Sequence, residues 1–296
     1  MDSAQTQQAH GRSALRTERI RTDDGLTLMA TVSGERGQPG VILLHGGGQT
    51  RHSWRGTVRT LGELGYHATA FDARGHGDSD WSPKSDYSYN RLADDLETVT
   101  QHMGCVPAMI GASMGGMTAM HAIGRATASL ARAMVLVDIA PRVDPKGLKR
   151  VNDFLNGHHD GFANIEEAAE AVAAYNPHRP RPKNPQGLMK NLRLREDGRL
   201  HWHWDPGFFR ARTDDQRERQ AARLLEMCRQ ITIPALLVHG AESDVVSLNG
   251  IGELRARLPQ LEIGTVPGAG HMIAGDRNEA FNVAIMPFLE RHPPTV

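Results

Sequence analysis

The segment Gly111-Ala112-Ser113-Met114-Gly115-Gly116 is the most informative stretch of this 296-residue chain. It follows a short apolar run, 106–110, and leads into residues 117–125, which have the composition of a helix. A serine with glycine two residues before it and two residues after it, between a strand and a helix, is typical of a nucleophile elbow. Such a tight turn requires glycine where side chains would collide with the neighbouring strand and helix.

The rest of the chain alternates between strand-like and helix-like segments. Continuous apolar strands that alternate with amphipathic helices predict a mostly parallel sheet covered by helices on both faces, an α/β fold. An Asp23-Asp24-Gly25 turn between the first two strands predicts a hairpin at the start of this sheet. The predicted strands are 16–22, 26–32, 41–44, 67–71, 106–110, 134–139, 233–239 and 261–266.

The alternation is interrupted once. Residues 142–230 contain few strand-like apolar runs and are expected to form mainly helices, with a hairpin around Asp197-Gly198. We therefore expect a core made of residues 16–141 and 231–296, a helical cap at 142–230, and a disordered tail at 1–15.

A serine hydroxyl is a weak nucleophile at neutral pH unless a base accepts its proton and an acid orients that base. In parallel sheets of this type, reactive groups lie just beyond the carboxyl ends of strands. His271 follows the predicted strand 261–266, and Asp244 follows 233–239. The order Ser113, Asp244, His271 therefore predicts a catalytic triad. Glu242 and Asp138 compete with Asp244 for the role of the acid, and Asp138 has the simpler interpretation of a turn residue at a strand end.

Acyl transfer also requires two N–H donors for the oxyanion that forms on attack. The residue after the nucleophile, Met114, is expected to supply one, and Gly47 in the loop His45-Gly46-Gly47-Gly48 is expected to supply the other. The same loop does not match a nucleotide-binding motif. Arg51 stands where a dinucleotide fingerprint needs its third glycine, and the Gly-Lys-Ser/Thr of a phosphate-binding loop is missing.

Composition and charge give no support to several other classes of protein. Lys plus Arg and Asp plus Glu number 34 each, so charge gives no argument for a nucleic-acid partner or an anionic membrane. No apolar run is long enough to span a bilayer, and the polar N-terminus does not resemble a signal peptide. The two cysteines, Cys105 and Cys228, do not suggest a disulfide framework. We expect a cytoplasmic protein.

Aromatic side chains are concentrated in the predicted cap. Trp202, Trp204, Phe208 and Phe209 are candidates for lining an apolar pocket above Ser113, although packing within the cap explains them equally well. Gln49 and Trp54, near the glycine loop, are further candidates for substrate contact. His201 and His203 have no evident third ligand, so we expect no metal site.

Taken together, these motifs resemble those of the α/β-hydrolase superfamily over nearly the whole chain, from about residue 16 to the C-terminus. The resemblance rests on the segments 44–47, 71–79, 111–116, 240–244 and 270–271. It is closest to the branch that contains epoxide hydrolases, C–C bond hydrolases, cofactor-free haloperoxidase-like esterases and small carboxylesterases. Ser113 in place of an aspartate nucleophile argues against an epoxide hydrolase or a haloalkane dehalogenase.

The resemblance implies a serine hydrolase that cleaves an ester or related acyl bond of a small, largely apolar molecule, without a metal or organic cofactor. A C–C hydrolase or lactonase would use the same triad, as would a haloperoxidase-like perhydrolase. A ligand receptor with slow turnover is the alternative from a different class. The oligomeric state, monomer or homodimer, and the identity of the substrate remain open.

Overall fold

The computed structural model describes residues 14–176, 184–210, 213–273 and 278–294. Most of the predicted N-terminal tail, residues 1–13, therefore lies outside the described residues. The main sheet has eight strands in the order β1-β2-β4-β3-β5-β6-β9-β10. The strands are β1 (Arg16–Arg21), β2 (Thr27–Ser33), β3 (Gly40–Leu44), β4 (His67–Phe71), β5 (Ala108–Ala112), β6 (Ala133–Val137), β9 (Ala235–Gly240) and β10 (Leu261–Val266).

The predicted fold class is confirmed. Strand β2 pairs antiparallel with both β1 and β4, and the pairs from β4 across to β10 are all parallel. The central strands β3, β5 and β6 are completely buried, which is why they are continuously apolar in sequence.

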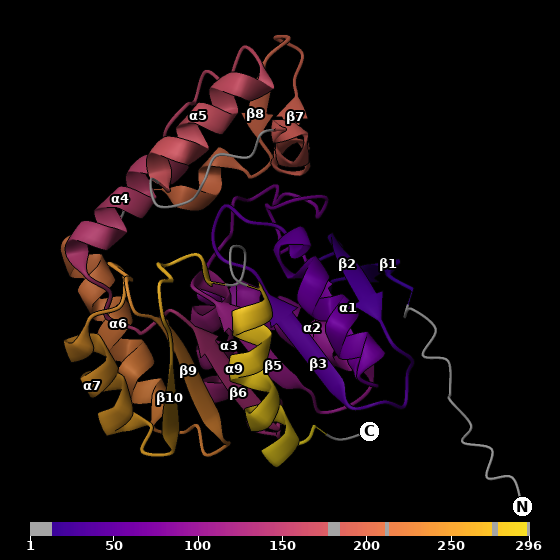
Figure 1. The fold of residues 1–296 in the computed structure, drawn as a ribbon, viewed down its shortest axis with the longest axis vertical. Helices are drawn as coiled ribbons and strands as arrows, with labels where there is room; N and C mark the ends of the chain where they lie inside the picture. Colours follow the sequence, from indigo (N-terminus) through magenta and orange to yellow (C-terminus); the bar gives the residue numbers. More distant parts are fainter. Residues whose placement is uncertain (1–13, 177–183, 211–212, 274–277, 295–296) are drawn as a thin grey trace, which may run out of the picture.

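Helices cover both faces of this sheet (Figure 1). One layer contains α1 and α9, and the other contains α2, α3, α6 and α7, with a separate hydrophobic cluster on each side. The helices are α1 (Arg55–Glu63), α2 (Tyr89–Met103), α3 (Met114–Arg125), α6 (Asp214–Cys228), α7 (Leu248–Arg257) and α9 (Asn278–Arg291).

A smaller unit projects from the sheet between β6 and α6 (Figure 1). It contains α4 (Pro145–Leu155), α5 (Ile165–Tyr175), the 3-10 helices η2 (Pro185–Asn191) and η3 (Pro206–Phe209), and the hairpin of β7 (Leu192–Leu194) and β8 (Leu200–Trp202). We call residues 145–209 the cap. Its own hydrophobic cluster includes Phe162, Trp202 and Trp204.

The region that leaves the sheet is shorter than the predicted cap of residues 142–230. Helix α6 falls within that range, yet it packs against α3 and α7 beside the sheet (Figure 1). Its buried residues Leu224 and Cys228 belong to the same hydrophobic cluster as the sheet. The sequence contains no strand between the cap and α6, so alternation alone does not reveal where the chain returns to the core.

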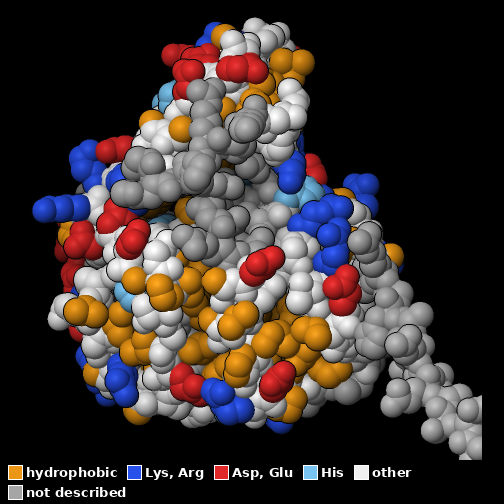
Figure 2. All heavy atoms as spheres, viewed as in Figure 1, with side chains coloured by type: hydrophobic (Ala, Val, Ile, Leu, Met, Phe, Trp, Pro, Cys, Tyr) orange, Lys and Arg blue, Asp and Glu red, His pale blue; other side chains and the backbone are white. Residues whose placement is uncertain are grey.

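The face of the molecule seen in Figure 2 carries apolar side chains over the lower body, around α9. Exposed apolar residues include Val283 of α9 and Ile263 of β10. Among the described residues, no helix has the length and apolar composition needed to cross a membrane.

Candidate active site

Ser113 lies at the sharp turn between β5 and α3. Its backbone has φ 47° and ψ −113°, a conformation that a residue with a side chain rarely adopts. The flanking glycines make this turn possible: a Cβ on Gly111 would lie 2.5 Å from the Gly116 nitrogen, and one on Gly115 would lie 2.5 Å from the Leu44 oxygen. The local geometry therefore matches the elbow expected from the sequence.

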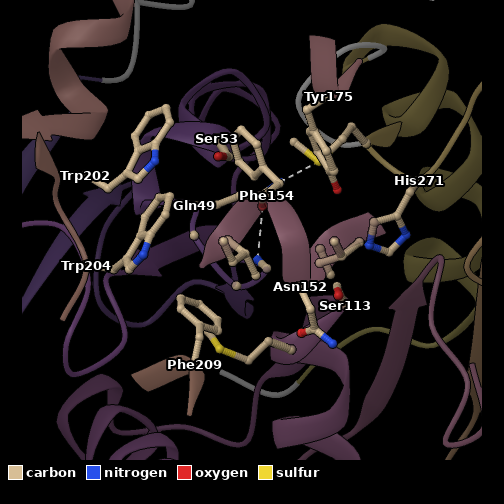
Figure 3. Close-up of a pocket in the computed structure, with 18 of the residues that line it drawn as sticks. Gln49, Ser53, Ser113, Asn152, Phe154, Tyr175, Trp202, Trp204, Phe209 and His271 are labelled. Atoms are coloured by element: carbon tan, nitrogen blue, oxygen red, sulfur yellow. Dashed lines mark hydrogen bonds between the residues drawn. The ribbon is translucent and has the colours of Figure 1, made fainter. Parts of the chain in front are cut away.

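His271 follows β10 and lines the same pocket as Ser113. Its Nδ1 lies 2.8 Å from the Oδ2 of Asp138. Since a carboxylate only accepts hydrogen bonds, Nδ1 carries the proton, and the other ring nitrogen, Nε2, is left as a base when the ring is neutral. Figure 3 shows Ser113 and His271 on one side of the pocket, facing Trp202 and Trp204 on the other.

Asp138 directly follows β6 and is completely buried. It accepts hydrogen bonds from Nδ1 of His239 at 3.0 Å, from the Gly240 N–H at 3.0 Å and from the Ser243 hydroxyl. Burial by itself would raise the pKa of Asp138, but the hydrogen bonds from His239, His271 and Ser243 outweigh burial and lower that pKa. Asp138 is thus held as a carboxylate beside His271.

The sequence-based choice of Asp244 as the partner of His271 is wrong. Asp244 is half exposed and forms a two-point ion pair with Arg150 of α4, at 2.6 and 2.8 Å. Both aspartates follow strands at the same edge of the sheet, so the rule about strand ends admits either one. Asp138, the competitor that was set aside, also has a positive φ of 47°, which marks it as a constrained position beyond an ordinary turn residue.

In the loop after β3, the N–H groups on either side of Gly47 have acceptors. The Gly46 N–H donates to Oε1 of Gln49 at 3.0 Å, and the Gly48 N–H donates to Nε2 of His76 at 3.1 Å. The N–H groups of Gly47 and Met114 have no acceptor among the described residues. Met114 begins α3, where the first N–H groups of a helix lack partners within the helix. These two donors are the ones that the sequence predicted for an oxyanion.

The pocket has a volume of about 660 Å³ and lies between the cap and the sheet. The predicted candidates Gln49, Trp202, Trp204 and Phe208 all line it, although Gln49 also bonds Gly46 and the Met272 sulfur, as dashed lines in Figure 3 show. Phe209, also a candidate from the sequence, lines it as well. Sequence reasoning missed further lining residues that come from the cap; those labelled in Figure 3 include Asn152, Phe154 and Tyr175.

The prediction that Trp54 contacts substrate is wrong. Its side chain is fully buried and packs against the Phe281 ring of α9, with ring centroids 5.5 Å apart. Trp54 ends the short helix η1 (Arg51–Trp54), which leads directly into α1, so its side chain enters the layer between α1 and the sheet. Proximity to the glycine loop in sequence did not reveal this orientation.

The two cap histidines considered as metal ligands have other partners. His201 pairs with Asp197 at 2.7 Å, and His203 accepts a hydrogen bond from the Gly77 N–H at 2.7 Å. Within the described ranges, no group of three or more His, Cys, Asp or Glu side chains is arranged to hold a metal ion.

Comparison with known proteins places most of the chain in one family. Residues 39–277 match a family model described as the alpha/beta hydrolase fold. The chain is 27% identical to an esterase of Mycobacterium tuberculosis over 254 residues, which cover 82% of this chain and 80% of the esterase. It is 28% identical to N-formylmaleamate deformylase of Pseudomonas putida over 256 residues, 86% of this chain and 89% of that enzyme.

Among solved structures, E-2-(acetamidomethylene)succinate hydrolase superimposes with a TM-score of 0.81. The match covers 94% of this chain and all of that chain, at 23% sequence identity. At this identity the likeness concerns the fold.

Proposed function

Because the chain belongs to the alpha/beta hydrolase fold family, whose model matches residues 39–277, we propose that it is a serine hydrolase that cleaves carboxylic esters or related acyl compounds. The observation that carries this proposal is the bond from His271 Nδ1 to the buried carboxylate of Asp138. That bond leaves Nε2 of His271 available in the pocket that contains Ser113.

The proposed reaction begins when Ser113 Oγ attacks the carbonyl carbon and His271 Nε2 accepts the hydroxyl proton. The N–H groups of Gly47 and Met114 stabilise the oxyanion of the tetrahedral intermediate. His271 then donates its proton to the leaving oxygen, the bond from the carbonyl carbon to that oxygen breaks, and an acyl-enzyme remains. Water attacks the acyl group while His271 accepts its proton, and the proton returns to Ser113 as the acid is released.

The pocket supports a small substrate with a substantial apolar part. A volume of about 660 Å³ accommodates a molecule of moderate size. Trp202 and Trp204 stack with ring centroids 5.0 Å apart, and Phe154 and Phe209 contribute further aromatic surface. The same triad would serve a C–C hydrolase or lactonase. A lactone is a cyclic ester and needs the same acyl transfer to water, whereas C–C cleavage also requires protonation of a carbon leaving group, so we favour an ester.

The substitution Ser113→Ala tests the nucleophile. We expect turnover of p-nitrophenyl butyrate to fall by roughly 10³-fold or more, because the oxyanion donors alone provide only residual catalysis. Initial rates and labelling by a fluorophosphonate probe would both be measured. Activity of Ser113→Ala within tenfold of the unmodified enzyme would exclude Ser113 as the nucleophile.

Binding without turnover is the alternative outcome. If a panel of esters raises the melting temperature of the unmodified protein but none is hydrolysed above background, the protein is a ligand receptor and the proposal of a hydrolase is wrong.

A further inference from the structure

Three buried histidines surround the loop that carries Gly47. They come from distant parts of the sequence: His45 directly follows β3, His76 lies in the turn after β4, and His203 follows β8 of the cap. The ring centroids of His45 and His76 are 5.2 Å apart, and those of His76 and His203 are 5.8 Å apart. Each ring is at most 1% exposed.

The hydrogen bonds of these rings settle their protonation. His45 Nε2 accepts from the Ala73 N–H at 2.9 Å, so the proton is on Nδ1, which donates to the Gly46 oxygen at 2.8 Å. His203 Nδ1 accepts from the Gly77 N–H at 2.7 Å, so the proton is on Nε2, which lies 3.3 Å from the Gly48 oxygen. Burial lowers the pKa of each of the three histidines, in keeping with neutral rings.

The two glycines on either side of Gly47 are therefore held by histidines. Gly46 is held through its oxygen by His45, and Gly48 is held through its N–H by His76 and through its oxygen by His203. The Gly46 oxygen and the Gly47 N–H belong to the same planar peptide unit, so the bond from His45 acts directly on the direction of that N–H. His76 and His203 hold the next two peptide units of the loop through Gly48.

One of these three supports comes from the cap. The hairpin that carries His203 is anchored to the turn after β4 by Arg193, which donates to the Gly77 oxygen at 3.0 Å and to Asp78 at 2.6 Å. Asp205 strengthens the same contact, since its N–H donates to the Gly75 oxygen at 2.9 Å. The position of the His203 ring thus depends on how the hairpin docks.

We infer that His203 is a positioning residue for the oxyanion loop: through its Nε2–H bond to the Gly48 oxygen, the docked cap hairpin helps to hold Gly48, and with it the adjoining Gly47, in place. This inference rests on the proposed function, in which Gly47 binds the oxyanion. It makes part of the catalytic machinery dependent on a cap residue that contacts neither the nucleophile nor the base.

Two substitutions separate the two bonds of His203. The side-chain oxygen of Asn reaches about as far as Nδ1, so His203→Asn keeps an acceptor for the Gly77 N–H and loses the donor to Gly48. The terminal amide of Gln reaches about as far as Nε2, so His203→Gln keeps the donor to Gly48. We expect His203→Asn to lower kcat by roughly 10- to 100-fold with KM within about twofold, and His203→Gln to retain kcat within about threefold.

A trifluoromethyl ketone, which forms a tetrahedral adduct with a serine and places an oxyanion in the site, provides a second measurement. Its affinity should fall for His203→Asn by about the same factor as kcat, whereas the affinity for a product carboxylic acid should not change. If His203→Asn fails to fold, Arg193→Ala serves as the second variant, because it removes the bonds that hold the hairpin to the turn after β4. The kcat of Arg193→Ala should fall by roughly three- to tenfold with KM unchanged.

A readout that does not require turnover keeps this test separate from that of the proposed function. In protein labelled with ¹⁵N-glycine, we expect the amide signals of Gly46, Gly47 and Gly48 to shift or broaden in His203→Asn and to stay near their positions in His203→Gln. Unchanged glycine signals together with unchanged kcat in His203→Asn would overturn the inference. An unmodified protein without esterase activity would instead contradict the proposed function.

Discussion

Among single residues, the site depends on which of two aspartates, both beyond the ends of strands, reaches His271. Asp138 and Asp244 both follow buried strands, but only Asp138 is buried against His271. Its carboxylate accepts four hydrogen bonds, and Ser243 and His239 help to hold it. Asp244 instead ties the cap to the core, because its partner Arg150 belongs to α4 and also donates to the Tyr175 oxygen.

The pair Asp138→Asn and Asp244→Asn tests this assignment. An amide at position 138 no longer stabilises the His271 imidazolium and favours the wrong tautomer, so we expect kcat for p-nitrophenyl butyrate to fall by roughly 10³- to 10⁴-fold. Asp244→Asn removes an exposed ion pair, for which kcat should stay within about threefold. A larger loss in Asp244→Asn than in Asp138→Asn would restore Asp244 as the acid.

At the scale of elements, the elbow between β5 and α3 depends on close backbone contact. Gly111 packs against the first turn of α3, and Gly115 packs against the end of β3. At these two glycines, β5, α3 and β3 approach one another too closely for a side chain to fit between them. This contact carries Ser113 above the edge of the sheet in its unusual conformation.

The substitution Gly111→Ala measures that contact. Its Cβ would meet the Gly116 nitrogen at 2.5 Å, so the backbone must move, and we expect a loss of about 1–3 kcal/mol in the free energy of unfolding.

The matched control is Gly252→Ala in α7, where an added Cβ meets nothing within 4 Å. There alanine should stabilise by about 0.5–1 kcal/mol, because it restricts the unfolded chain and favours helix. Urea unfolding of both variants, followed by circular dichroism, compares the two. Equal effects would mean that the elbow is not tightly packed.

At the scale of the whole molecule, the pocket is assembled from the cap and the core, and the buried histidines lie at their junction. His203 packs near His76 and His45, with Arg193 and Asp78 as its nearest charged neighbours and Asp72 and Arg51 beside His45. Burial is the main cause that lowers the pKa of His203, to about 3, and the charge of Arg193 acts in the same direction.

This environment makes the junction sensitive to acid. In the unfolded chain His203 has its ordinary pKa of 6.5, whereas in the folded protein it titrates at about 3. The unfolded state therefore binds a proton first, so the contribution of His203 to stability is complete above about pH 6.5 and is lost as the pH falls towards 3. We expect the free energy of unfolding to fall more steeply between pH 7 and pH 4 in the unmodified protein than in His203→Gln. Urea midpoints at several pH values measure this difference, and parallel curves would show that His203 is not protonated differently in the two states.

The α/β architecture, the turn with Ser113 and the position of His271 after β10 could all be predicted from the sequence. These features are local: glycine spacing, apolar runs and strand ends follow from short-range sterics and periodicity. Other features could not be predicted from the sequence: the aspartate that bonds His271, the position of α6, the packing of Trp54 against α9, and the contact of His203 with Gly48. Each of these depends on contacts between elements that lie far apart in the sequence. Local patterns of residues carry no information about such contacts, because they are set by how the elements pack.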